Sequence, residues 1–189
     1  MNGYRTLVPS PRKVSLAWRI FALCLLIPFS LAAFAQTAAS PELRFNDLSG
    51  KAHSLADYRG KIVVLNFWAT WCMPCREEMP MLSRLAPQYA EKDVAVLAVS
   101  LDDAETQSKI PAFLTKKKIT LPVWTGATPT DLKQFDLGGI VPATVILDRD
   151  GSAAFRISGE ASRKDVSSRL DWLLSDRAAK RPKTLLKNF

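Results

Sequence analysis

The sequence predicts an α/β fold in which helices flank a central mixed β-sheet. Two apolar runs, residues 62–67 and 94–99, are each followed by a stretch with apolar residues at helical spacing. Such strand–helix alternation is typical of parallel strands. Further along, residues 144–147 and 153–157 flank the turn-forming sequence Asp-Arg-Asp-Gly at 148–151, which is a hairpin pattern. Parallel pairs combined with an antiparallel hairpin make the sheet mixed.

An N-terminal hairpin is expected to precede this sheet. Residues 43–45 and 54–55 flank the turn-like sequence Asp-Leu-Ser-Gly-Lys at 47–51. The run 62–67 that follows is almost continuously apolar, as expected of a central strand that is buried on both faces.

Two helices have clear sequence signals. After the first apolar run, a core stripe recurs every three or four residues at Cys75, Met79, Leu82, Ala86 and Tyr89. Near the end of the chain, Ser162 and Asp165 have the spacing of a capping box. The helix that they begin has one apolar face, formed by Val166, Leu170, Leu173 and Leu174.

The first 35 residues have the features of a secretory signal peptide. Basic residues precede the apolar run 20–31, and Ala33-Phe34-Ala35 is an A-x-A cleavage site. Cleavage after Ala35 would leave 189 − 35 = 154 residues, a single-domain length. The alternative is an uncleaved membrane anchor, although the apolar segment is shorter than the roughly 20 residues that span a bilayer. We therefore divide the chain into a signal (1–35), a leader (36–41), a folded domain (42–176) and a basic tail (177–189).

Positive charge is unevenly distributed along the chain. The 26 Lys and Arg residues exceed the 18 Asp and Glu residues by 8, but four basic residues lie in the signal, so the mature chain carries 22 − 18 = +4. The remaining excess is local, at residues 116–118 and 180–187. We interpret both segments as solvated ends and expect no nucleic-acid binding. Membrane contact is expected only through the signal or anchor segment, or weakly through the basic tail.

The chemistry-bearing motif is Cys72-Met73-Pro74-Cys75, which lies where the first core strand gives way to a helix. Cysteines three residues apart at a helix start can close a disulfide, and Cys72 would face the positive end of the helix dipole. Both effects favour a thiolate at Cys72 and hence a nucleophile. The spacing therefore predicts a redox-active dithiol.

Two other uses of the cysteine pair are disfavoured. A structural zinc site usually takes four Cys or His ligands, whereas Cys24 lies in the apolar N-terminal stretch and His53 is the only histidine. A purely structural disulfide across so short a loop stabilises by only about 2 kcal/mol, against ~4.7 kcal/mol for a hundred-residue loop. We expect no metal and no cofactor other than the Cys72–Cys75 disulfide itself.

The sequence from Val64 to Pro80, VLNFWATWCMPCREEMP, closely resembles the TlpA/ResA group of exported thioredoxin-like proteins. Support comes from residues 48–51, 55–61 and 139–144, and the resemblance extends over about 42–174. It implies a thioredoxin-like fold with an added N-terminal hairpin. It also implies a thiol:disulfide oxidoreductase in which Cys72 attacks a partner disulfide and Cys75 resolves the mixed disulfide.

The resemblance assigns roles to further residues. Thioredoxins have a buried aspartate where Asn66 stands, and an amide cannot act as that base. Glu78 matches a glutamate that the TlpA/ResA group places near its dithiol, so we hypothesise that it tunes the cysteine pKa and proton transfer. The alternative is an exposed helix carboxylate. Pro142 matches the family's cis-proline, beside which Val141 would offer its backbone to an extended partner segment.

We expect Trp71 and Pro74 to form an apolar lip for that partner segment. The resemblance further implies a periplasmic reductant that receives electrons from a membrane thiol reductase. Its partners would be exported proteins bearing disulfides or dithiols, in cytochrome c maturation or oxidase copper-site assembly.

This function has several alternatives. The direction of transfer stays open, because reduction potentials on this fold run from about −270 to about −120 mV. The alternatives are therefore a disulfide oxidase or isomerase, and a non-enzymatic module that binds thiol-bearing partners or acts as a chaperone. A peroxiredoxin-type peroxidase and a Sco-type copper carrier are disfavoured, because the Pro-x-x-x-Thr-x-x-Cys context of the first and the C-x-x-x-C and downstream histidine of the second are missing.

Overall fold

The fold is built on one eight-stranded mixed sheet with the strand order β2-β1-β5-β4-β3-β6-β7-β8. The computed structural model describes residues 43–186, so the expected signal and leader, including Cys24, lie outside the described residues. The strands are β1 (Arg44–Asp47), β2 (Ala52–Ser54), β3 (Ile62–Trp68), β4 (Val94–Ser100), β5 (Val123–Thr125), β6 (Ala143–Leu147), β7 (Ala153–Ser158) and β8 (Leu185–Leu186). The α-helices are α2 (Met73–Tyr89), α3 (Ile110–Lys117), α4 (Pro129–Lys133) and α5 (Arg163–Leu174), with 3₁₀ turns at Leu55–Tyr58, Ala90–Lys92 and Gln107–Lys109.

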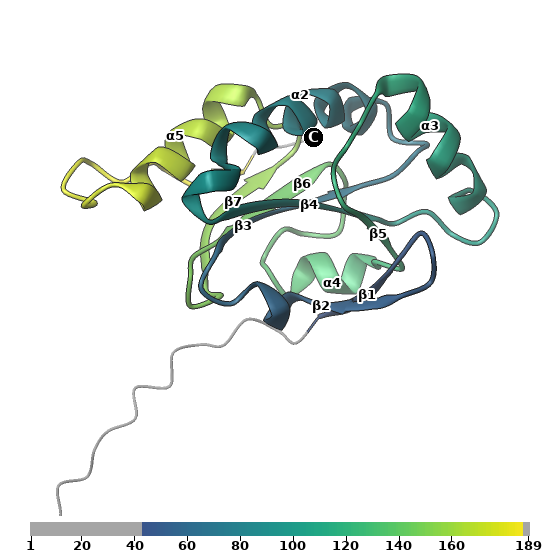
Figure 1. The fold of residues 1–189 in the computed structure, drawn as a ribbon, viewed down its shortest axis with the longest axis horizontal. Coiled ribbons are helices and arrows are strands. Elements are labelled where there is room, and N and C mark those ends of the chain that lie inside the picture. Colours follow the sequence, from purple (N-terminus) through teal and green to yellow (C-terminus); the bar gives the residue numbers. More distant parts are fainter. Residues whose placement is uncertain (1–42, 187–189) are drawn as a thin grey trace, which may run out of the picture. The chain divides into compact units, whose positions relative to one another are not determined.

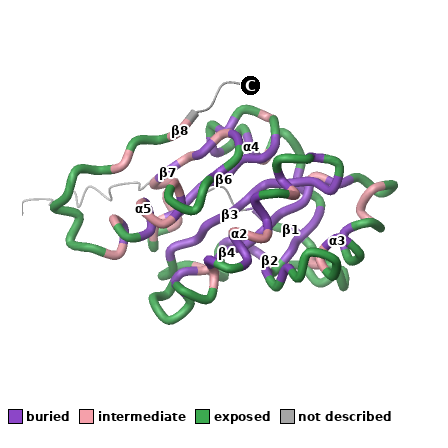
Figure 2. Tube along the Cα trace, turned by 90° about the horizontal axis from the view of Figure 1, so that it is seen from above, coloured by how far each residue is buried: buried purple, intermediate pink, exposed green. Residues whose placement is uncertain are grey.

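Strand β3 is the centre of the sheet. It pairs in parallel with β4 and antiparallel with β6, and all seven of its residues are buried. Figure 2 shows this buried central band along β3 and β4. The β6–β7 pair is antiparallel, as the Asp-Arg-Asp-Gly turn predicts. The predicted mixed α/β sheet is thus confirmed.

The predicted N-terminal hairpin is also present and extends the sheet. Strands β1 and β2 pair antiparallel, and β1 continues onto β5. In the connecting turn Gly50 has φ 86°, a conformation that favours glycine. The Asp47 carboxylate accepts hydrogen bonds from the backbone N–H groups of Ser49 and Lys51 and closes the turn.

Helices cover both faces of the sheet. In Figure 1, α2, α3 and α5 lie on one face and α4 lies on the other. Successive strand residues point to opposite faces, and two neighbours in β3 illustrate it. The Phe67 ring lies 6.1 Å from that of Phe135, which follows α4, whereas the Trp68 ring lies 5.3 Å from that of Phe113 in α3. The end of β3 is therefore fixed from both sides.

The two helices with clear sequence signals form as predicted. In α2 the stripe residues Cys75, Met79, Leu82 and Tyr89 are buried, while Ala86 is half-buried. Ser162 begins α5 with the expected capping box to Asp165.

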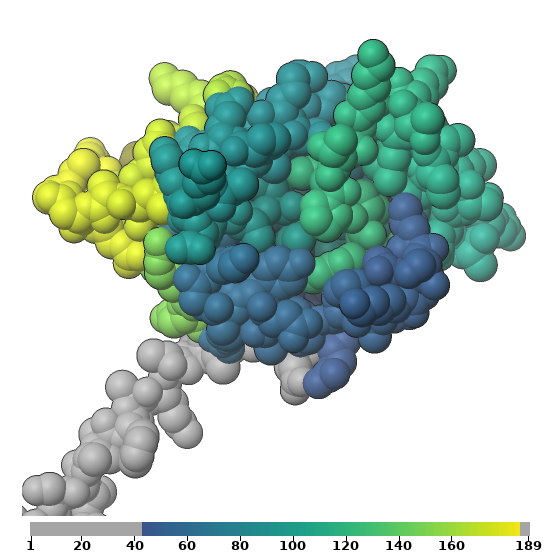
Figure 3. Space-filling view, in the orientation of Figure 1, coloured from purple at the N-terminus to yellow at the C-terminus, as the bar shows by residue number. Residues whose placement is uncertain are grey.

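The first part of the segment expected as a basic tail packs on the domain. Strand β8 pairs in parallel with β7, and the Arg181 guanidinium lies over the rings of Phe155 and Trp172. Arg181 also donates to the Ala154 carbonyl across 2.7 Å. This segment lies with α5 at one end of the folded domain, in yellow in Figure 3. Within residues 43–186, no helix has the length and apolar character needed to cross a membrane.

Candidate active site

The cysteine pair lies at the junction between β3 and α2. Cys72 is the N-cap residue of α2 and forms a disulfide with Cys75, in the first turn of the helix. The backbone N–H of Cys75 donates to Cys72 Sγ across 3.3 Å. Cys72 keeps 6% of its surface exposed, whereas Cys75 is fully buried. Cys72 is thus the better placed of the two for attack by or on a partner, and the helix N-terminus favours its thiolate.

A buried carboxylate that sequence reasoning missed holds the turn before Cys72. Asp102 Oδ2 accepts from the Thr70 backbone N–H across 2.8 Å, and Oδ1 accepts from the Thr70 hydroxyl across 2.5 Å. The Ser100 hydroxyl donates to Oδ2 across 2.6 Å. Parallel pairing of Trp68 with Ser100 brings the ends of β3 and β4 together. The signal available in the sequence was a carboxylate three residues after the end of the second apolar run.

Glu78 lies on the buried face of α2 and not on its exposed face. Its side chain is buried, which excludes the alternative of an exposed helix carboxylate. Oε1 accepts from Asn66 Nδ2 across 2.5 Å, and Oε2 accepts from the Ala161 backbone N–H across 2.7 Å. Asn66 Nδ2 also donates to Thr144 Oγ1 across 3.0 Å. Strand β3 and the loop before α5 therefore both contact this carboxylate, one helical turn beyond Cys75, and β6 is linked to it through Asn66.

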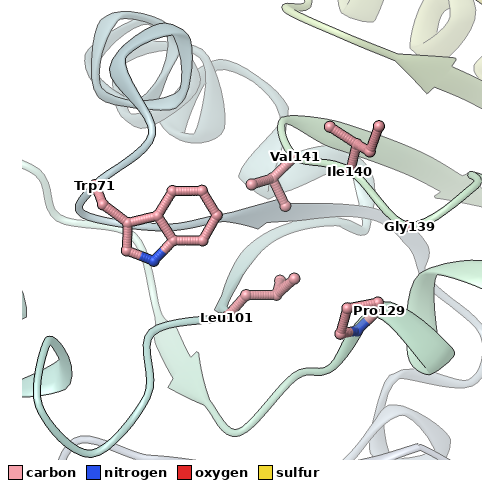
Figure 4. A pocket seen from close by; sticks show the side chains of 6 residues that line it. All are labelled: Trp71, Leu101, Pro129, Gly139, Ile140 and Val141. Carbon is pink, nitrogen blue, oxygen red and sulfur yellow. The ribbon is translucent and has the colours of Figure 1, made fainter.

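An apolar cavity of about 300 Å³ is lined by Trp71, the residue before Cys72, and by Val141, the residue before Pro142. Figure 4 shows Trp71 and Val141 facing it from two sides, with Leu101 and Pro129 at its base. The Val141–Pro142 peptide bond is cis, and the Pro142 carbonyl accepts from the Gly159 backbone N–H across 2.9 Å. Trp71, one wall of this cavity, is 61% exposed.

Not every predicted site residue lines the cavity. Pro74 is exposed in the first turn of α2 but is not among the lining residues, which are Trp71, Leu101, Pro129, Gly139, Ile140 and Val141. Two of the lining residues, Trp71 and Ile140, are exposed, at 61% and 60%. Ile140 was not singled out from the sequence.

His53 belongs to the N-terminal hairpin. Its Nε2 lies 2.9 Å from Asp47 Oδ2, and its ring stacks on Trp124 with centroids 5.4 Å apart. Hydrogen bonds from Ser49 and His53 hold the pKa of Asp47 well below its usual range. Among residues 43–186, no three His, Cys, Asp or Glu side chains come together as a group that could hold a metal ion.

A redox disulfide at the N-terminus of the helix that follows the central strand, beside a loop with a cis-proline, defines a thioredoxin-fold thiol-disulfide oxidoreductase. Residues 36–155 match the AhpC/TSA family. The chain is 34% identical over 139 residues to the thiol-disulfide oxidoreductase ResA of Geobacillus thermodenitrificans, covering 74% of this chain and 78% of that protein. It is 38% identical over 136 residues to the thioredoxin-like protein YneN of Bacillus subtilis, covering 70% and 76%.

A solved structure has the same fold. The crystal structure of a thioredoxin-family thiol:disulfide interchange protein from Chlorobium tepidum superposes with a TM-score of 0.61 at 26% identity, covering 72% of this chain and 96% of that one. The chain belongs to the AhpC/TSA family, and within it to the ResA-type thiol-disulfide oxidoreductases. The names of these relatives agree with dithiol chemistry rather than with the peroxidase alternative.

Proposed function

We propose that this oxidoreductase works as a reductant of disulfides in exported proteins. The observation that carries exchange through Cys72 is the unequal placement of the two sulfurs, and the reductant direction follows the resemblance to the TlpA/ResA group. Cys72 lies at the helix N-terminus directly after Trp71, which lines the apolar cavity, whereas Cys75 is fully buried. A partner disulfide can therefore reach Cys72 first, and Cys75 is kept for the second step.

The reaction proceeds by two thiol exchanges. The Cys72 thiolate attacks one sulfur of the partner disulfide, so a mixed disulfide forms and the other partner sulfur leaves as a thiolate, which takes up a proton. Cys75 then loses its proton and attacks Cys72 Sγ, which closes the Cys72–Cys75 disulfide and releases the second partner thiol. The protein is oxidised by two electrons, and the partner disulfide is reduced to a dithiol.

Glu78 is proposed to control the second step. Residues three apart on a helix are neighbours, so the Glu78 carboxylate lies on the Cys75 side of α2. A buried negative charge there raises the cost of a second negative charge on the Cys75 thiol. The same carboxylate can accept the proton that Cys75 must lose. The Asn66 and Ala161 donors hold it in place for both roles.

Partner binding is proposed to use the loop around the cis-proline. An extended partner segment would pair with the backbone of Val141, beside Pro142, and place an apolar side chain in the cavity against Trp71. Pro74 would border the same segment from the helix side. The lining of the cavity and the exposure of Trp71 support this arrangement.

The cellular setting is proposed from the signal-like segment 1–35 and the ResA relatives. The protein would act in the periplasm. Either the segment is cleaved, which leaves a mature chain of leader, domain and basic tail, or the segment stays and anchors the protein to the membrane. A membrane thiol reductase would return it to the dithiol state. Cytochrome c maturation or oxidase copper-site assembly would be the pathway served, and the Cys72–Cys75 disulfide would be the only redox group required.

The equilibrium reduction potential of the Cys72/Cys75 couple tests the direction of transfer. The purified protein is equilibrated in redox buffers, and free thiols are counted by the mass added on alkylation. We expect a value near that of thioredoxin, about −270 mV. A value near that of DsbA, about −120 mV, would make the protein an oxidase or isomerase. A pair that does not cycle would leave only the binding or chaperone function.

A further inference from the structure

A second cavity of about 240 Å³ adjoins the Cys72 turn on the side of α3. Its charged lining residues are Arg76 from α2, Lys109 from the 3₁₀ turn before α3, and Lys116 from the last turn of α3. Thr70 and Phe113 complete the wall together with Ala112. Three cations and no carboxylate line this cavity, which we call the cationic groove.

The Arg76 side chain is held toward the groove by packing. Its guanidinium lies over the Phe113 ring, 5.6 Å from the centroid, and the residue is half-buried. Its backbone N–H donates to the Cys72 carbonyl across 3.2 Å. Arg76 is therefore hydrogen-bonded through its backbone to the turn that carries the reactive sulfur. Because its side chain is already held by packing, it loses little conformational freedom on binding an anion.

In the part of the chain that the structure describes, none of the three groove cations forms an ion pair. The pairs between His53 and Asp47, between Arg156 and Asp136, and between Arg177 and Asp148 all lie elsewhere. Asp102, which is hydrogen-bonded to Thr70 of the groove, is buried and also accepts from Ser100. Glu77, beside Arg76, and Glu105, four residues before Lys109, lie nearer to the groove in sequence, but both are exposed and neither lines the groove. Positive potential in the groove is thus left for a partner to complement.

The groove and the apolar cavity flank the same short turn. Thr70 lines the groove and the next residue, Trp71, lines the apolar cavity, while Cys72 follows directly. A polypeptide whose disulfide sulfur reaches Cys72 can therefore place an apolar side chain on one side and acidic side chains on the other. The two cavities together offer a partner two distinct kinds of contact.

We propose that the cationic groove binds carboxylates of an acidic segment that flanks the reactive disulfide of the partner protein. The inference rests on the proposed function, since the partner is the protein whose disulfide is exchanged. Opposite charges across such a surface accelerate encounter and set the orientation of the partner. Because both lysines are exposed, salt must weaken the effect.

Two disulfide-bonded peptides test the proposal. They share the same ring and apolar residue, and one is flanked by glutamates where the other has glutamines. The second-order rate at which the reduced protein opens each peptide is measured at low and high salt. We expect the glutamate peptide to react about three- to tenfold faster at low salt, with the ratio falling toward one at 0.5 M salt. In the double variant Lys109→Gln/Lys116→Gln, the ratio of the two rates at low salt should fall to less than half of its wild-type value.

A matched control separates the groove from net charge. Lys61→Gln/Lys117→Gln removes the same two charges from exposed sites that do not line the groove, one of them on α3 itself. An equal fall of the ratio in this control, or an unchanged ratio in the groove variant, would overturn the proposal.

A binding measurement separates this proposal from the proposed function. The glutamate peptide with its cysteines replaced by serine is titrated against the protein and followed by intrinsic fluorescence. If the peptide binds more weakly to the groove variant but not to the control, the groove is supported. That conclusion would hold even if neither disulfide peptide were reduced, although failed reduction would refute the reductant function. Equal binding to the groove variant and the control would overturn the groove.

Discussion

Asn66 donates a hydrogen bond from its amide nitrogen to Glu78 Oε1 across 2.5 Å, which joins the central strand to the active-site helix beneath the dithiol. The two residues are both buried. The neutral amide of Asn66 can donate a hydrogen bond, which an ionised carboxylate at this position could not do. The carboxylate of this pair is therefore Glu78 on the helix, and the strand provides the amide.

The charge of Glu78 is expected to set the pH dependence of the dithiol. In Glu78→Gln the buried negative charge is gone, so a thiolate costs less and the apparent pKa of the cysteine pair should fall by about one unit. The pH profile of thiol alkylation in the reduced protein measures this. Glu77→Gln, in the exposed neighbour, is the control and should keep the wild-type profile. An unchanged profile in Glu78→Gln would leave the carboxylate with a packing role only.

The variant Asn66→Asp should destabilise the protein in a pH-dependent way. It places two carboxylates within hydrogen-bond distance in the core, so at least one folded-state pKa rises above its unfolded value. The folded state then binds more protons than the unfolded state, and stability falls as pH rises above about 4. Urea unfolding at pH 4.5 and pH 8 should show a larger loss relative to wild type at pH 8. Equal losses at both pH values would contradict the expected coupling.

Asp102 is expected to act as a positioning residue for the turn before Cys72. In Asp102→Ala, both Thr70 donors lose their buried acceptor, at a cost of about 1 to 3 kcal/mol in the free energy of unfolding. Amide hydrogen exchange at Thr70 and Trp71 should also become faster, because the turn opens more often. Asp103→Ala is the control, since that carboxylate is exposed and accepts only from its own turn. Slow exchange retained in Asp102→Ala would refute the positioning role.

Trp71 is expected to contribute to partner binding and little to stability. The side chain is 61% exposed, so Trp71→Ala should change the free energy of unfolding by less than about 1 kcal/mol. The kcat/KM for a protein disulfide should fall about five- to thirtyfold, as for other exposed aromatic anchors. Oxidised glutathione, which has no apolar side chain to place in the cavity, should react at nearly the wild-type rate.

Met73 provides the comparison for Trp71. It is 60% exposed and adjacent to Cys72, but it does not line the apolar cavity. The substitution Met73→Ala should therefore cost less than threefold in kcat/KM. Similar losses in both variants would point to general apolar contact around the sulfur instead of the cavity.

Because of Tyr89, we expect the folded protein to lose stability at alkaline pH. Burial, together with the hydrogen bond that its hydroxyl donates to Asp171, raises the pKa of Tyr89 to about 12. A pKa above the unfolded value of 10.0 means that this contribution is complete below pH 10 and is lost between pH 10 and 12. Thermal unfolding across that range should show a smaller decline in Tyr89→Phe than in the wild type, although the variant is less stable at neutral pH.

The sequence by itself determined the local features of this protein. Apolar runs identified β3 and β4, the three-and-four spacing identified the buried face of α2, and Ser162 with Asp165 identified the start of α5. The C-x-x-C spacing also placed both sulfurs in one helical turn. These features follow from neighbours within a few residues, for which backbone geometry dictates the pattern.

Only the tertiary structure decided what surrounds the dithiol. Asn66, Glu78 and Thr144 come from β3, α2 and β6, and the register of those elements brings them together. The Asp102 brace depends in the same way on the parallel pairing of β3 with β4. The cationic groove exists because α3 packs beside the first turn of α2. Contacts between distant segments depend on strand order and helix placement, which periodicity along the chain does not encode.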